Sequence, residues 1–297
     1  MCAALNRNET TPYSYLSALL TVSLLGSLLS ASKLLEGSCL AFAALAIAGA
    51  LMLLLAPLFL RLLSLLCLEK GRFPLSLMWF LTGLSLLHGA VISYFTILNL
   101  HTTFLPHTPI LALSALLLAA PLVSLRHSDA TLFRLSHLLL PSITLLLLVT
   151  LYCQTQWRQI LGILRSLPWQ EARDLPKQSL LMLALVFLNP AVSTSMLFPD
   201  LDPDIFLKIQ RKGVFAATLA LSVMLLMPVT TLGVPLFQSV RDPLYWAADV
   251  VIHGTPLVRV DALLNTVIFF TTLTDLSLCL QTLRVTLREW RRRKQAP

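Results

Sequence analysis

The sequence contains few charged residues. Asp, Glu, Lys and Arg together make up 12% of its 297 residues, against roughly 25% in an ordinary soluble domain. Hydrophobic residues make up 57%. So few charges could not cover the surface of a water-soluble domain, and disorder is excluded because disordered chains combine low hydrophobicity with high net charge. The composition therefore predicts an all-α polytopic membrane protein.

Motifs for catalysis and metal binding are lacking as well. The five cysteines stand singly, without a CxxC pair or a metal-ligand spacing to histidine. GxSxG, HExxH, GxGxxG and phosphate-binding glycine loops are absent. We therefore expect no enzyme, no metal and no cofactor. The net charge of +8 does not indicate a nucleic-acid partner, because the basic residues lie in the C-terminal tail and in short gaps between apolar runs.

Long uncharged stretches are what the chain has instead. A membrane-spanning helix needs about 20 mostly apolar residues. The stretch 73–125 is too long for one helix, and the polar, proline-bearing segment 99–109 divides it into two. The whole chain is therefore expected to be one transmembrane domain of eight spans, at about 12–33, 37–62, 74–98, 108–125, 134–156, 178–199, 212–238 and 259–284.

The distribution of Lys and Arg predicts the orientation, because these residues favour the cytosolic side. An even number of spans places both termini on one side, and cytosolic termini put most of the 22 Lys and Arg residues inside. Segment 285–297 is then a basic cytosolic tail that faces anionic lipid. Segment 156–177 mixes Trp, Ile and Leu with Arg at three- and four-residue steps, which predicts a helix lying in the outer interface.

Asp275 is the sharpest signal of a site. Its carboxylate lies inside the last predicted span, where a charge costs about 2.5–3.5 kcal/mol on insertion scales. Asp275 must therefore face a partner, a cavity or water, or be protonated. Two interpretations stay open: a contact with a ligand or ion, and a buried structural pair, for example with Arg284.

The sixth predicted span contains a helix breaker followed by hydroxyl groups. Pro190 cannot donate a backbone hydrogen bond and disfavours helix at Asn189, and the run Ser193, Thr194 and Ser195 follows. Broken helices bind small polar ligands at the midplane of many transporters. A kink whose free carbonyl is satisfied by Ser or Thr is the alternative.

Polar residues in two other spans give weaker signals. In the first span, Gly26 and Ser27 follow Ser23, and small residues of this kind more often mark close helix packing. In the third span, His88 and Tyr94 are more typical of hydrogen-bonded packing than of ligand contacts.

Three short motifs occur in a characteristic order: LPHTP at 105–109, RLSHLLLP at 134–141 and RVDAL at 259–263. In this order and spacing they resemble the spore germination receptor B-subunit family, a branch of the amino acid/polyamine/organocation transporter superfamily. The resemblance covers about residues 12 to 290. It implies a LeuT-type inverted-repeat bundle that lacks the last two of the family's usual ten helices.

The resemblance also implies a function: a membrane subunit of a nutrient germinant receptor in the inner membrane of a bacterial spore. It would bind a small-molecule nutrient, often an amino acid, and its partners would be the germinant receptor A and C subunits. A secondary transporter of amino acids or polyamines and a structural membrane subunit without a ligand are the alternatives.

The same resemblance implies a ligand pocket between the first, third, sixth and eighth helices. Two positions depart from the family. The family tends to carry Lys where this chain has Asp275, which reverses the charge at that position, and it often has an acidic residue near the start of helix six where this chain has Ser179. The pocket residues carried over are Gly26, Ser27, Tyr94, Asn189, Ser193 and Asp275.

Overall fold

The computed structural model describes residues 23, 38–66, 73–125, 136–145, 165, 167–184, 192–193, 196–197, 203–240, 246–247 and 260–295. These residues form helices and connecting turns, with no strand among them. Three of the helices are long and apolar enough to cross a membrane, within 41–58, 75–102 and 266–295. The described residues are thus helical, with three helices that could span a membrane, while the eight-span LeuT-type arrangement stays a prediction.

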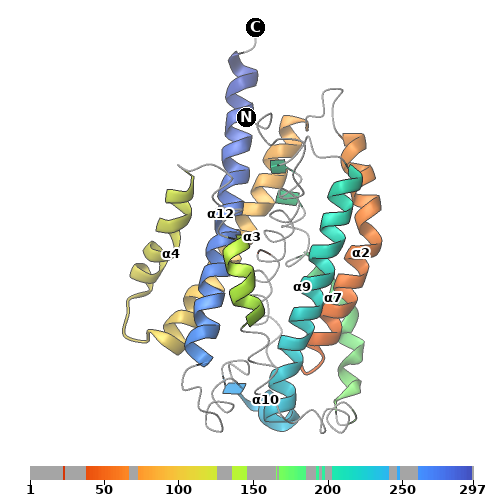
Figure 1. The fold of residues 1–297 in the computed structure, drawn as a ribbon, viewed down its shortest axis with the longest axis vertical. Helices are drawn as coiled ribbons and strands as arrows, with labels where there is room; N and C mark the ends of the chain where they lie inside the picture. The colour runs from red at the N-terminus through yellow and green to blue at the C-terminus, as the bar shows by residue number, and fades with distance from the viewer. Residues whose placement is uncertain are drawn as a thin grey trace.

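Figure 1 shows the described helices as a bundle in which most axes run along one direction. Their bounds are α2 Ala41–Leu66, α3 Leu75–Asn99 with the π-helical turn η3 Leu100–Phe104, α4 Ile110–Ser124, the 3-10 turn η5 Trp169–Asp174, α7 Leu175–Met182, α9 Pro203–Leu232, α10 Val234–Ser239 and α12 Val260–Gln295. A further described helical segment covers 136–145.

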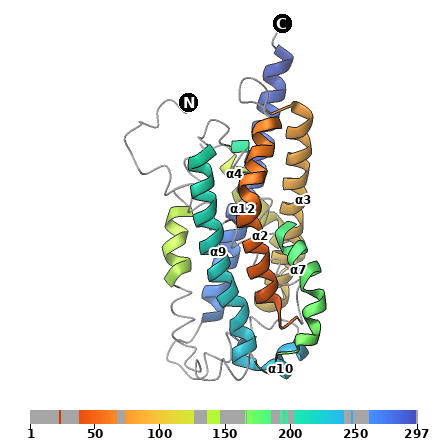
Figure 2. The ribbon, with the colours of Figure 1, turned by 90° about the vertical axis from the view of Figure 1, so that its right-hand side faces the viewer.

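Two antiparallel helix pairs organise the described residues. In the first pair, α3 packs against α12, and α4 lies beside both. In the second pair, α2 packs against α9, and α7 lies against α2. Figures 1 and 2 show that α2 and α9 run side by side in both views.

The chain reverses direction between α3 and α4, within the polar segment that divides the long uncharged stretch. The π-helical turn η3 ends at Phe104, and α4 begins after Pro109. Pro109 precedes the first turn, where its missing N–H leaves no helical hydrogen bond unmade. His101 Nδ1 lies 3.2 Å from the carbonyl oxygen of Thr108 and helps to hold the turn.

Two helices are longer than the apolar pattern predicts. Helix α9 begins at Pro203 rather than near 212, because proline is well tolerated in the first helical turn. Helix α12 runs through the basic tail to Gln295 rather than ending near 284. Arg, Leu and Lys are strong helix formers, and Arg293 pairs with Glu289 one turn earlier at 3.0 Å. Arg293 also donates to the carbonyl oxygen of Phe73, at 2.8 Å, which ties the end of α12 to the start of α3.

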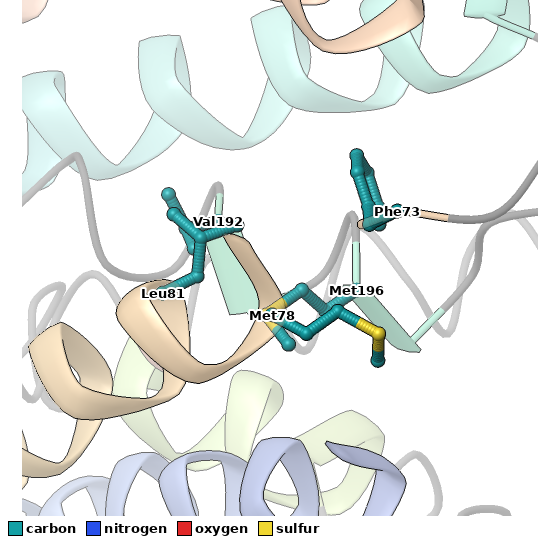
Figure 3. Close-up of a cluster of buried hydrophobic side chains, with 5 residues drawn as sticks. All are labelled: Phe73, Met78, Leu81, Val192 and Met196. Atoms are coloured by element: carbon teal, nitrogen blue, oxygen red, sulfur yellow. The ribbon is translucent and has the colours of Figure 1, made fainter. Parts of the chain in front are cut away.

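An apolar cluster joins the start of α3 to the segment predicted as the sixth span (Figure 3). Its five side chains are all buried. Three come from the start of α3 and the residue preceding its cap, and two from the sixth segment. The cluster consists of Phe73, Met78, Leu81, Val192 and Met196. It fixes the sixth segment beside α3 and thereby sets the position of Ser193, which directly follows Val192.

Candidate functional site

The central part of α12 lies in the interior of the described bundle. Residues 271–279 of this helix are all buried, although a helix on the surface of a bundle would bury only one face. Asp275 lies in the middle of this stretch and is 0% exposed. The carboxylate that the sequence places inside the last span is therefore enclosed by protein.

Both oxygens of the Asp275 carboxylate have hydrogen-bond partners. Ser23 Oγ donates to Oδ1 at 2.5 Å, and His88 Nε2 lies 3.1 Å from Oδ2. These partners come from the first predicted span and from α3, so three segments that are far apart in sequence meet at this carboxylate. Hydrogen bonds to both oxygens lower the cost of burying the charged group. We call Ser23, His88 and Asp275 the Asp275 cluster.

The sequence of α3 explains why His88 reaches Asp275. Buried residues recur along α3 at three- and four-residue steps, which defines one inward face. Gly89 lies on this face, where a Cβ atom would come within 3.3 Å of Leu276 Cδ2 and 3.4 Å of Cys279 Cβ. The missing side chain lets the two helices approach closely, and the imidazole of His88 thereby comes within hydrogen-bond distance of α12.

Hydroxyl pairs continue the polar contacts along the same face. Thr82 and Thr286 lie 2.7 Å apart through their Oγ1 atoms, and Thr96 and Thr272 lie 3.0 Å apart. The order of these pairs confirms the antiparallel register, since residue numbers rise along α3 as they fall along α12. Together with the contact between His88 and Asp275, these two pairs form what we call the polar seam of α3 and α12.

A third hydroxyl pair brings the sixth segment to the site. Ser85 Oγ and Ser193 Oγ lie 3.2 Å apart, and both side chains are buried. Ser85 precedes His88 by three residues, about one helical turn. Four segments thus contribute polar groups to one region: the first span through Ser23, α3, the sixth segment through Ser193, and α12.

The charge of the cluster depends on one proton. With a neutral imidazole on His88, an ionised Asp275 leaves the cluster with one negative charge. With an imidazolium, the two residues form a neutral ion pair, and His88 is 6% exposed. A carboxylate enclosed in a low-dielectric interior attracts positive charges and hydrogen-bond donors. Chemically, the cluster is suited to holding a cation or a hydrogen-bonding polar group.

The structure brings together two of the residues predicted for the pocket, Ser193 and Asp275. It does not bring Tyr94 to them, since this side chain is 63% exposed on the outer side of α3. Gly26, Ser27 and Asn189 lie outside the described residues. Asp275 contacts Ser23 and His88, whereas Arg284, the partner that the sequence suggested, donates to Gln281 Oε1 at 3.3 Å.

His88 and Ser23 are the site residues that sequence reasoning passed over. His88 was interpreted as a packing residue, and it is indeed hydrogen-bonded, but its partner is the intramembrane acid. The signal was present in its spacing to Thr82, Ser85 and Thr96, which places it on a polar helix face that Tyr94 does not share. For Ser23, the sequence offers only a weaker indication of a site residue, a hydroxyl group three residues before Gly26.

Comparisons with known proteins add no family to this geometry: no family model, no curated protein and no solved structure matches the chain. The membership in the germination receptor family therefore stays a prediction from the three motifs. Within the described ranges, no three His, Cys, Asp or Glu side chains gather as a metal site would require.

Proposed function

We propose that the protein is the membrane subunit of a nutrient germinant receptor and that it binds an amino acid at the Asp275 cluster. The observation that carries this proposal is the meeting of Ser23, His88 and Asp275 inside an apolar helical bundle, with the Ser85–Ser193 pair one turn away. Ionisable residues within membrane spans usually mark ligand or ion sites.

The groups of the cluster match the chemistry of an amino acid. The carboxylate of Asp275 would accept hydrogen bonds from the ligand's ammonium group. The imidazole of His88 and the hydroxyls of Ser85 and Ser193 would donate to its carboxylate. These contacts are charge-assisted, which makes each of them stronger than a bond between neutral groups.

Binding at this place would also change the conformation of the bundle. Asp275 is 0% exposed, so a ligand that reaches its carboxylate has to move the segments that enclose it, among them those of Ser23 and His88. The first span, α3 and α12 would therefore separate or shift. The ligand would drive this change by its differential affinity for the two arrangements, and the receptor A and C subunits would respond to the new one.

Thermal unfolding of the purified protein in detergent tests the proposal. We expect one or a few of the common amino acids to raise the Tm, since a ligand of the native state stabilises it by mass action. Asp275→Asn should abolish this rise while leaving a folded protein, because Asn has the same shape and still accepts a hydrogen bond.

Asp204→Asn is the matched control, since Asp204 lies exposed in the first turn of α9; this variant should respond as the wild type does. An absence of any rise in the wild type would contradict the proposal. So would an equal rise in Asp275→Asn.

A secondary transporter of amino acids or polyamines is the second candidate. It is favoured by the pairing of His88 with Asp275, because intramembrane carboxylates and histidines form proton relays in many transporters. Uptake of a labelled amino acid into proteoliposomes separates the two. Binding without uptake supports the receptor subunit, and accumulation that Asp275→Asn abolishes supports the transporter.

A further inference from the structure

We infer that the start of α9 forms a binding site for the phosphate of an anionic membrane lipid. The three side chains that would hold the phosphate are those of Lys208, Arg211 and Lys212, and none of them belongs to the Asp275 cluster. The inference is therefore independent of the proposed amino-acid site. It follows from the arrangement of these cations on one face of a helix, at the edge of the apolar region.

The three cations share a face because α9 begins at Pro203. The hydropathy pattern places Lys208 and Arg211 before a span that starts near 212, where their directions would be unrelated. In the structure all three belong to the same helix, at positions i, i+3 and i+4, which lie on one side of it. Their side chains are exposed. The opposite side of this part of α9 is buried, through Gly213, Val214 and Ala217.

The packing of α9 on α2 gives the depth of these cations in the membrane. Gly49 of α2 lies against Thr218 of α9, and the two helices are antiparallel. Seven residues further along each helix, Arg211 is level with Ala56. The apolar window of α2 ends close by, since it covers 18 residues within 41–58, which span about 27 Å and so nearly the thickness of the hydrocarbon layer. The cations therefore lie at the boundary between acyl chains and headgroups.

The direction of the cations and their neighbours on the same face both favour a lipid. Helical side chains lean toward the N-terminus of their helix, which for α9 is the direction of the headgroups. The charged groups can thus reach the phosphates while their stems stay in the apolar layer. One and two turns further along this face, Phe215 and Leu219 are 63% and 59% exposed, where the acyl chains of the same lipid would lie.

The protein does not neutralise the charge of this face. Within Pro203–Leu232 the only acidic side chain is that of Asp204, one turn before Lys208, so three cations and one carboxylate leave a net charge of +2. None of the three cations forms an ion pair among the residues that the structure describes. The guanidinium of Arg211 can bind two phosphate oxygens at once, and the two lysines add point charges beside it. An anionic phosphate diester matches this combination.

Native mass spectrometry of the protein in detergent measures the apparent Kd of phosphatidylglycerol, with phosphatidylcholine as the zwitterionic comparison. The measurement is made on the full chain with Arg288→Gln, Arg291→Gln and Arg292→Gln, because the basic tail of α12 is itself expected to contact anionic lipid. We expect phosphatidylglycerol to bind more tightly than phosphatidylcholine. Equal affinities for the two lipids would overturn the inference.

Replacing the three cations tests the assignment to α9. We expect Lys208→Gln, Arg211→Gln and Lys212→Gln each to weaken the binding of phosphatidylglycerol about fivefold and, when combined, about a hundredfold, because each basic residue near the surface adds attraction of this order. The binding of phosphatidylcholine should stay unchanged. An unchanged Kd for phosphatidylglycerol in the triple variant would contradict the inference.

The matched control removes the same charge at the opposite end of α9. Arg165, Arg173 and Lys177 are exposed there, since Leu175, at the start of α7, packs in one cluster with Val229 of α9. The variant with these three cations changed to Gln should keep the affinity for phosphatidylglycerol. Equal weakening in both triple variants would show that net charge alone is responsible, and the site on α9 would be wrong.

Two competitors separate a lipid from other anionic partners. Glycerol 3-phosphate carries the phosphate without acyl chains, and binding as tight as that of phosphatidylglycerol would show a site for a soluble phosphate instead of a lipid. A peptide of ten glutamates represents an acidic protein surface. If it binds in place of phosphatidylglycerol, the face docks a protein and the inference is wrong. Failure of both competitors to displace the lipid supports the inference, and the amino-acid site is tested separately by its effect on the Tm.

Discussion

In both antiparallel helix pairs a glycine lies at the helix contact, but the two pairs differ in the hydrogen bonds of their buried polar side chains. The two helices of each pair pack closely at this glycine: Gly89 of α3 faces Cys279 and Leu276, and Gly49 of α2 faces Thr218. In the α3–α12 pair, threonines bridge the helices in pairs. In the α2–α9 pair, the buried polar atoms of α9 meet no hydrogen-bond partner among the described residues. These atoms belong to Gln210, Thr218 and Ser222.

The difference extends to hydroxyls that do not cross between helices. On α12, Thr271 and Thr274 donate to the carbonyl oxygens one turn earlier, at 2.8 and 2.9 Å. Thr218 and Ser222 of α9 make no such bond in the part of the chain that the structure describes. A buried polar group without a partner costs about 1–3 kcal/mol. Close packing therefore holds α2 to α9, whereas hydrogen bonds also set the register of α3 on α12.

The packing of α2 depends on small residues. Ala44, Ala48 and Ala56 are fully buried and recur at four-residue steps or multiples of them, and Gly49 lies on the same side. Small residues at such spacing allow close approach of helix backbones in membranes. The large apolar residues of α2, such as Leu54 and Leu58, point outward, as expected for contact with lipid.

The substitution with the largest expected effect disrupts the packing of α2 against α9 by steric overlap. In Gly49→Leu, the new side chain would overlap Thr218, because even a Cβ atom at position 49 collides with it. We expect a loss of about 3 kcal/mol of unfolding free energy, measured by denaturation in mixed detergent micelles. Gly83→Leu is the control, since a Cβ at Gly83 meets nothing within 4 Å. Equal losses in both variants would show that helix propensity, not overlap, is responsible.

The second effect breaks the polar seam at its charged contact. Asp275→Leu leaves His88 and Ser23 without the acceptor that they now share. We expect a loss of about 2 kcal/mol of unfolding free energy, because the hydroxyl of Ser23 and the imidazole of His88 each lose a hydrogen bond to Asp275. The double variant Asp275→Leu with His88→Leu should recover part of this loss, since it also removes the imidazole that loses its hydrogen bond to Asp275. No recovery would show that Asp275 stabilises the bundle independently of His88.

The third effect has the opposite sign and tests the α9 side of the comparison. Gln210 is 1% exposed, and neither atom of its amide has a partner among the described residues. Gln210→Leu should therefore raise the unfolding free energy by about 1 kcal/mol, seen as a higher Tm in detergent. Gln238→Leu serves as the control, because Gln238 is exposed and donates to Glu171. A destabilised Gln210→Leu would mean that this amide is hydrogen-bonded in the membrane.

The smallest effect concerns a single hydroxyl pair of the polar seam. Thr82→Val keeps the shape of the side chain and removes its hydrogen bond to Thr286. We expect a loss of about 0.6 kcal/mol of unfolding free energy, the average for such bonds between membrane helices. A double-mutant cycle with Thr286→Val isolates this value. A coupling energy near zero would show that the two threonines lie close together without stabilising the protein.

The apolar pattern predicted the all-helical class and the long apolar helices, because residues that contact lipid are almost all apolar. Uncharged stretches located α2, α3 and α4, and the polar segment 99–109 located the turn between the last two. Helix ends were predicted less well. Charged residues end an apolar pattern without ending a helix, so the basic continuation of α12 and the first residues of α9 could not be assigned from hydropathy.

The candidate site was predicted at Asp275 and Ser193, because each is a polar residue where polarity is costly. Tyr94 was chosen over His88, although the two lie about 120° apart around the helix. The buried face of α3 decides between them, and that face is set by contacts with α12. A contact between residues that lie far apart in the sequence, such as Ser23 and Asp275, could not be predicted from a single sequence.

Helix α12 contains neither proline nor glycine between Val260 and Gln295, whereas α2, α4 and α9 each contain an internal proline. A helix without such residues has no kink or hinge of this kind, and it moves as one rigid element. Asp275 and Arg293 lie about 27 Å apart along it. A displacement of the helix at Asp275 therefore also displaces the basic residues near its C-terminal end, without a relay of side chains between them.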